Sequence, residues 1–156
     1  MKVLVVYDSF FGNTEQIARA VGRALEAQGE VETVKIGEVM PEQIQGTDLL
    51  IVGSPTRAFQ PTQPIKTFLK TMPPNLLKGV KVAAFDTRIS VEDTNSGFLK
   101  FMVKIFGYAA KPIADLLKKK GGSLVQPPEG FYVKDSEGPL KEGELDRAAL
   151  WARSMC

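Results

Sequence analysis

The sequence contains no histidine and a single cysteine, two residue types that commonly serve as catalytic groups and metal ligands. Without histidine, neither Ser-His-Asp nor Cys-His catalysis is available, and the commonest metal ligand is missing. Cys156 alone cannot form an intramolecular disulfide, an iron–sulfur cluster or a zinc–thiolate site. We therefore expect no catalytic acid, base or nucleophile and no metal site, in a reducing, cytoplasmic setting.

Long apolar runs and a charge excess are also missing. The N-terminal apolar stretch is only about five or six residues long before Asp8, which is too short for a signal peptide. No segment approaches the roughly 18 uncharged residues that a membrane span needs. Lys plus Arg number 20 and Asp plus Glu number 18, so the net charge is +2. We expect no transmembrane segment and no nucleic-acid partner, because that balance does not indicate nucleic-acid binding.

What the sequence does contain is an alternation of short apolar runs with helical patterns. Its 156 residues predict a single domain, residues 1–156. Strands are expected at residues 3–7, 31–36, 49–52 and 80–85, with a weaker fifth strand at 123–133 that Pro127 and Pro128 interrupt. A first helix follows residue 14 and ends near Gly29, and a last helix spans residues 142–154. This alternation predicts an α/β fold with a parallel sheet buried on both faces.

In such folds the ligand lies beyond the carboxyl ends of the strands, here residues 8–14, 54–62 and 86–97. The first of these segments opens a helix, where unpaired N–H groups and the helix dipole favour an anion. Ser9, Asn13 and Thr14 add polar side chains, and Gly12 lets the backbone approach a phosphate closely. The patterns G-x-x-x-x-G-K-[ST] and G-x-G-x-x-G are both absent. The alternative is that Asn13 or Thr14 only caps the helix.

Two of these segments carry a resemblance to a known family. Residues 9–15 read SFFGNTE, which resembles the [ST]-x-T-G-N-T-E motif of the flavodoxin family, and residues 53–59, GSPTRAF, resemble its second loop. The order of elements matches over residues 2–154, whereas residues 85–90 match the third loop poorly. The resemblance implies a three-layer α-β-α sandwich whose five-stranded parallel sheet has the order 2-1-3-4-5. It also implies an FMN site.

The resemblance places the FMN phosphate on residues 9–14 and the flavin ring between the second and third loops. The implied cofactor-binding residues are Ser9, Phe10, Phe11, Gly12, Asn13, Thr14, Pro55, Thr56, Arg57, Ala58, Phe59, Asp86, Thr87 and Arg88. Phe11 replaces a phosphate-binding threonine of the family, and Arg57 stands where an aromatic ring often stacks on the flavin. Phe59 is expected either to supply that ring or to fill the core. Ala58 stands where the family often has glycine, and a positive φ there costs alanine about 1 kcal/mol.

Residues 97–120 are unusually apolar around most of a helical circumference. Lysines 100, 104, 111 and 118 share one stripe with Asp115, and residues 98–106 supply most of the apolar surface. Pro112 is expected to break the segment into two helices that meet near Gly107. We expect burial against the sheet. The alternative is a contact surface at residues 98–106 for a second copy, a partner, a quinone or a membrane surface.

Three functions are consistent with these features. The first is a small FMN protein that carries electrons between redox partner proteins and needs no acid, base or nucleophile. The second is a flavoenzyme on the same fold, such as a quinone or protoporphyrinogen-type oxidoreductase, which the apolar segment at 98–106 favours. The third is a binding or regulatory domain without flavin, which Phe11 and the poorly matched third loop favour.

Overall fold

The computed structural model describes residues 1–90 and 96–156, with the backbone alone at residues 105 and 106. Its strands form one parallel sheet in which β4 pairs with both β5 and β6, and the order β2-β1-β3-β4-β5 confirms the expected arrangement. The strands are β1 (Lys2–Tyr7), β2 (Glu30–Lys35), β3 (Leu49–Pro55), β4 (Lys81–Ile89), β5 (Ser123–Leu124) and β6 (Glu129–Val133). The helices are α1 (Asn13–Leu25), α2 (Pro41–Ile44), α3 (Gln63–Thr71), α4 (Gly97–Phe106), α5 (Ala110–Lys119) and α6 (Glu144–Arg153).

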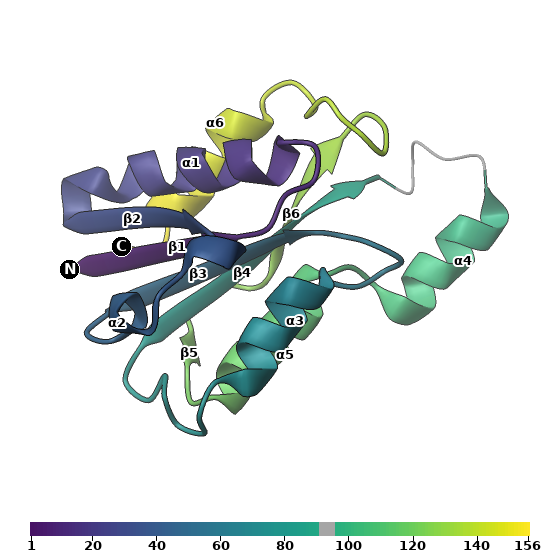
Figure 1. Ribbon diagram of the computed structural model, residues 1–156. Coiled ribbons are helices and arrows are strands. Elements are labelled where there is room, and N and C mark those ends of the chain that lie inside the picture. The colour runs from purple at the N-terminus through teal and green to yellow at the C-terminus, as the bar shows by residue number, and fades with distance from the viewer. Residues whose placement is uncertain (91–95) are drawn as a thin grey trace.

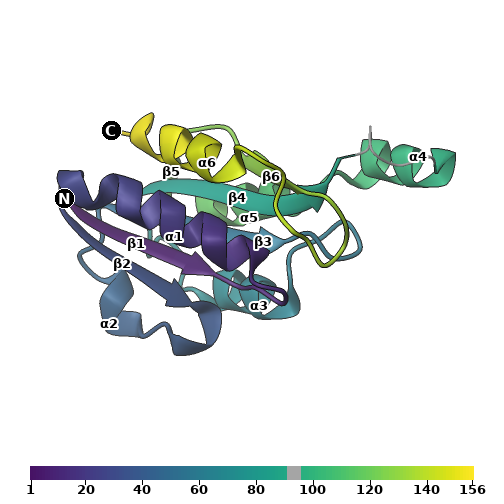
Figure 2. The same ribbon diagram turned by 90° about the horizontal axis from the view of Figure 1, so that it is seen from above.

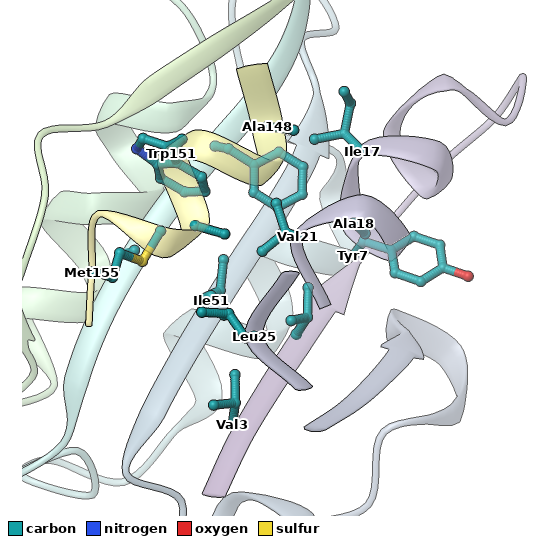
Figure 3. Packing of buried hydrophobic residues seen from close by; sticks show 14 of the residues in the cluster. Val3, Tyr7, Ile17, Ala18, Val21, Leu25, Ile51, Ala148, Trp151 and Met155 are labelled. Atoms are coloured by element: carbon teal, nitrogen blue, oxygen red, sulfur yellow. The ribbon is translucent and has the colours of Figure 1, made fainter. Parts of the chain in front are cut away.

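Helices cover both faces of the sheet, with α1 and α6 on one face and α3 and α5 on the other (Figure 1). Alternate side chains of each strand supply the two cores, as the twofold period of a strand requires. Val3 and Val5 pack under α1 and α6, whereas Leu4 and Val6 pack under α3 and α5. Figure 3 shows side chains of α1 and α6 gathered over β1 and β3. The continuous apolar runs in the sequence follow from burial on both faces.

The centre of the α1–α6 face is aromatic. Phe85, Phe131 and Trp151 form an edge-to-face cluster with ring centroids 5.8 to 6.0 Å apart. Gly53 makes room for it, because a Cβ atom there would lie 2.0 Å from Cζ of Phe85. Glycine at the end of β3 is therefore required by packing.

The fifth strand position is occupied by two short segments. β5 pairs with the start of β4 and β6 with its end, and Pro127 and Pro128 lie between them. Proline cannot donate to a sheet, so the interruption expected from the sequence is confirmed. The fourth strand, in contrast, continues four residues beyond the expected end at residue 85, so residues 86–89 form strand rather than loop. Residues 91–95 of the expected third loop lie outside the described residues.

Residues 97–120 form two helices, as expected from Pro112, with Gly107 directly after α4 at φ 72°. The expected deep burial of the first helix is wrong. Phe98 and Phe101 are 72% and 58% exposed, and α4 extends away from the helices that cover the sheet (Figure 1). Among the residues that the structure describes, no helix is long and apolar enough to cross a membrane.

Candidate functional site

A cavity of about 350 Å³ opens at the carboxyl ends of β1, β3 and β4. The loops that follow these strands gather at that end of the sheet (Figure 2). Residues from all three expected segments line the cavity, together with Val133 at the end of β6 and Ser136 in the loop that follows it. The lining residues are Ser9, Phe10, Phe11, Asn13, Thr14, Pro55, Thr56, Arg57, Ala58, Thr87, Arg88, Ile89, Val133 and Ser136.

One wall of the cavity is the start of α1. Gly12 precedes the helix at φ 90°, and its carbonyl accepts the first helical hydrogen bond, from the N–H of Gln16. The helix itself cannot pair the N–H groups of residues 13–15, which lie at the positive end of its dipole. No side chain caps this helix, so the alternative that Asn13 or Thr14 serves only as a cap is wrong. The arrangement can hold an anion without a cationic side chain.

Polar side chains of the first loop are tied to other parts of the cavity wall. The Thr14 and Thr87 hydroxyls lie 2.8 Å apart and join α1 to the end of β4. The Asn13 amide donates to the carbonyl of Glu137 at 3.1 Å. The Ser9 hydroxyl accepts from the N–H of Gly12, and buried Asp8 accepts from the N–H of Ser9 at 2.9 Å. The loop is thus held in place before any ligand binds.

The second loop is a tight hairpin. Arg57 and Gln60 exchange backbone hydrogen bonds of 2.8 and 2.9 Å, which leaves Ala58 and Phe59 as its two central residues. Their φ angles of 47° and 68° lie in the left-handed region, as in the type I′ turns that favour Asn-Gly. The Arg57 guanidinium lies 4.9 Å from the centre of the Phe10 ring. This contact joins the first and second loops at the rim of the cavity.

The end of β4 brings a buried ion pair to the cavity. Arg88 donates from Nε and Nη2 to the two carboxylate oxygens of Asp86, at 2.7 and 2.6 Å. Asp86 also accepts from the N–H of Ala110, and the Arg88 guanidinium lies 3.7 Å from the centre of the Tyr108 ring. Gly130 flanks Arg88, because a Cβ atom there would lie 2.1 Å from its Nε. Burial raises the pKa of Asp86, and the hydrogen bonds from Arg88 and Ala110 oppose that rise.

The structure brings eleven of the fourteen implied site residues into the cavity wall, and three lie elsewhere. Gly12 shapes the helix start behind the wall. Asp86 is fully buried and reaches the cavity only through Arg88. Phe59 is partly buried and lines a second cavity of about 200 Å³, which shares Thr56, Ala58, Arg88 and Ile89 with the first.

The sequence did not predict the part of the wall that comes from the C-terminal third of the chain. Val133, the last residue of β6, and Ser136 line the cavity. A Cβ atom at Gly138 would lie 2.6 Å from Oδ1 of Asn13, so the loop after β6 packs directly on the first loop. The only signal was the Gly-rich character of residues 135–143, which indicates a loop but not where it packs.

Comparisons with known proteins agree with this fold. The flavodoxin family model matches residues 5–151. The fold is similar to a flavodoxin from the domain Archaea, with 21% identity, TM-score 0.76 and coverage of 99% of this chain and 96% of that one. It is also similar to oxidised Flavodoxin 2 from Bacillus cereus, with 23% identity, TM-score 0.75 and coverage of 99% and 97%. No curated protein matches the chain.

Proposed function

Since the chain belongs to the flavodoxin family, whose members bind FMN, we propose that it is an electron carrier that holds FMN in the cavity at the ends of β1, β3 and β4. The observation that carries the proposal is the make-up of one cavity. It combines an anion-binding site, formed by the N–H groups of residues 13–15 at the start of α1, with apolar walls at the second loop and the end of β4. FMN supplies one- and two-electron transfer. The protein needs only to bind and orient it, which agrees with a sequence that lacks histidine.

In this proposal the two ends of the cavity bind different parts of FMN. The N–H groups of residues 13–15 and the hydroxyls of Ser9 and Thr14 are all donors that a phosphate accepts from. Pro55, Ala58 and Ile89 offer apolar contacts to the ring. The partners are a reductase and an acceptor protein, and the proposed compartment is the cytoplasm. The flavin-free alternative loses its basis, because FMN is the cofactor of the family.

A pair of variants at Phe11 tests this orientation. Phe11 is 49% exposed and lines the cavity beside α1, so replacing it leaves the core intact. Phe11→Glu and Phe11→Gln differ mainly in one negative charge. We expect the Glu variant to bind FMN about tenfold more weakly than the Gln variant. Riboflavin, which lacks the phosphate, should bind the two variants equally.

Flavin fluorescence quenching measures both affinities. Equal FMN affinity for the two variants would place the phosphate away from α1. Wild-type protein that loses FMN on desalting and shows no quenching would exclude the carrier proposal altogether.

The second cavity favours a second candidate function, a flavin oxidoreductase that acts on a small apolar molecule such as a quinone. Phe59, Leu99 and Val103 give it apolar walls, and it shares four residues with the first cavity. Anaerobically reduced holoprotein mixed with benzoquinone distinguishes the two candidates. An oxidoreductase should show a rate that saturates with quinone and falls in Val103→Trp, which fills the cavity. A carrier should show a rate linear in quinone and the same in both proteins.

A further inference from the structure

Helix α4 (Gly97–Phe106) presents two different faces. Leu99, Met102 and Val103 are partly buried, and Leu99 and Val103 line the second cavity. On the other side Phe98, Lys100, Phe101 and Lys104 are exposed. The two phenylalanines are three positions apart and therefore lie on the same side of the helix, one turn apart.

The exposed face belongs to a part of the chain with a large excess of positive charge. Residues 97–120 contain six lysines and one acidic residue, Asp115, although the whole chain carries a net charge of only +2. Asp115 lies 3.1 Å from Lys111 and 3.7 Å from Lys118, both in α5. Helix α4 itself contains no acidic residue, so the exposed phenylalanines have lysines as their charged neighbours on the helix.

The shape of this region decides what it fits. In both ribbon views α4 projects beyond the body of the molecule, so its aromatic residues lie on a protrusion (Figures 1 and 2). A protein partner would need a matching apolar pocket lined by acidic groups. A bilayer with anionic lipids offers an apolar layer under negatively charged phosphates to any protrusion. At ten residues, α4 is about 15 Å long, half the hydrocarbon thickness, so it can lie in the interface but cannot cross it.

We propose that α4 docks the protein on anionic membrane surfaces. Phe98 and Phe101 enter the boundary between headgroups and acyl chains, and Lys100 and Lys104 pair with lipid phosphates. Because Leu99 and Val103 of the same helix line the second cavity, docking sets that cavity beside the bilayer. If the proposed flavin function is correct, docking also brings the cofactor site close to the membrane. The docking itself does not depend on flavin.

Co-sedimentation with vesicles tests the proposal on the full chain, with and without FMN. The probes are phosphatidylcholine vesicles and vesicles with about 30% phosphatidylglycerol, at low and high salt. We expect binding to the anionic vesicles that weakens as salt rises. Lys100→Gln/Lys104→Gln should weaken it roughly 25-fold, at about fivefold per lysine. Phe98→Ser/Phe101→Ser should weaken it about tenfold or more.

Matched variants outside α4 control for general loss of charge or apolar surface. Leu150→Ser removes an exposed residue of α6, and Lys70→Gln/Lys78→Gln removes two exposed lysines. Both should bind anionic vesicles as the wild type does. Absence of binding at low salt, or α4 variants that bind like the wild type, would overturn the proposal. A stable dimer that Phe98→Ser/Phe101→Ser converts to a monomer would also overturn it, because a second copy would then cover this face.

Discussion

At the scale of single residues, the most consequential contact is the pair that Arg88 forms with Asp86. The resemblance to flavodoxins places Arg88 among the implied FMN-binding residues, and it does line the cavity. The structure also holds its guanidinium between a buried carboxylate and the Tyr108 ring, with its side chain 16% exposed. Part of its positive charge is therefore neutralised before any flavin binds. Asp86 and Arg88 are two positions apart in one strand, so their side chains lie on the same face. The sequence indicates this pairing only if the strand is predicted to continue to Ile89.

Replacing Arg88 by methionine should destabilise the protein in a pH-dependent way. The variant leaves Asp86 buried without its cation, which costs about 3–5 kcal/mol of unfolding free energy at pH 7. The pKa of Asp86 is already raised in the folded wild type, and losing Arg88 raises it further. A raised pKa in the folded state favours folding at low pH, so the loss of unfolding free energy in Arg88→Met should shrink as pH falls. Urea unfolding of the variant and the wild type from pH 4 to 8 measures this loss.

The double variant Asp86→Asn/Arg88→Met is the control. It has no buried charge at this position, so it should recover much of the lost stability at pH 7 and vary less with pH than Arg88→Met. A single variant as stable as the wild type at pH 7 would show that the pair contributes little.

At the scale of elements, the hairpin of the second loop holds two non-glycine residues at positive φ. Ala58→Gly should raise the unfolding free energy by about 1 kcal/mol, because glycine adopts φ 47° without the steric cost that alanine meets. Thermal unfolding measures the gain. Ala149→Gly within α6 is the matched control and should lose about 1 kcal/mol. A loss at both positions would mean that the hairpin is not strained at Ala58.

A second element-scale contact fixes α6 to the edge of the sheet. Glu144, at the start of α6, accepts from the N–H of Tyr132 at 2.7 Å and forms an ion pair with Arg147 at 2.7 Å. Arg147 also donates to the carbonyl of Gly130. Burial acts to raise the pKa of Glu144, but hydrogen bonds from Arg147 and Tyr132 outweigh it and hold that pKa below its usual value. The loop that reaches the cavity starts and ends at this junction.

The lowered pKa predicts how Glu144→Gln depends on pH. A carboxyl whose pKa is depressed by folding contributes stability above its unfolded pKa and loses it as pH falls through the folded pKa. At pH 7 the variant should lose about 1.5–3 kcal/mol of unfolding free energy. The difference should begin to shrink near the unfolded pKa of about 4.3 and keep shrinking as pH falls through the lower folded pKa. Urea unfolding at pH 7 and pH 3 measures both, and exposed Glu142→Gln should change stability little at either pH.

The elements differ in how far the sequence predicts them. An apolar run such as Leu49–Val52 predicts a strand reliably, because a short run that is buried on both faces fits few other structures. The end of β4 was missed because Asp86 and Arg88 are charged, and charge usually indicates a loop. In this strand the two charges satisfy each other, so the strand continues. Helix α4 was expected to be buried because its pattern is apolar, yet pattern alone does not show whether a neighbour covers it.

At the scale of the whole molecule, the cavity joins segments that are distant in sequence. Parallel strands bring residues 9–14, 55–58 and 87–89 to one end of the sheet, and this convergence follows from topology that the sequence predicts. The fourth segment, Val133 and Ser136, depends on how a loop packs on Asn13. That contact involves a backbone carbonyl and a close approach at Gly138, neither of which leaves a pattern in the sequence.

A ligand that contacts all four segments should stabilise the molecule as a whole, since it binds only when they are assembled. FMN at about 100 times its Kd should add about 2.7 kcal/mol to the unfolding free energy. For a chain of this length that raises Tm by roughly 5–10 °C. Riboflavin at the same concentration should raise Tm by less. The difference between the FMN and riboflavin increases in Tm should be smaller in Phe11→Glu than in the wild type. Scanning calorimetry measures these Tm values. An equal rise in Tm with FMN and with riboflavin would mean that the start of α1 contributes nothing to FMN binding. The anion-binding site at the start of α1 would then have another ligand.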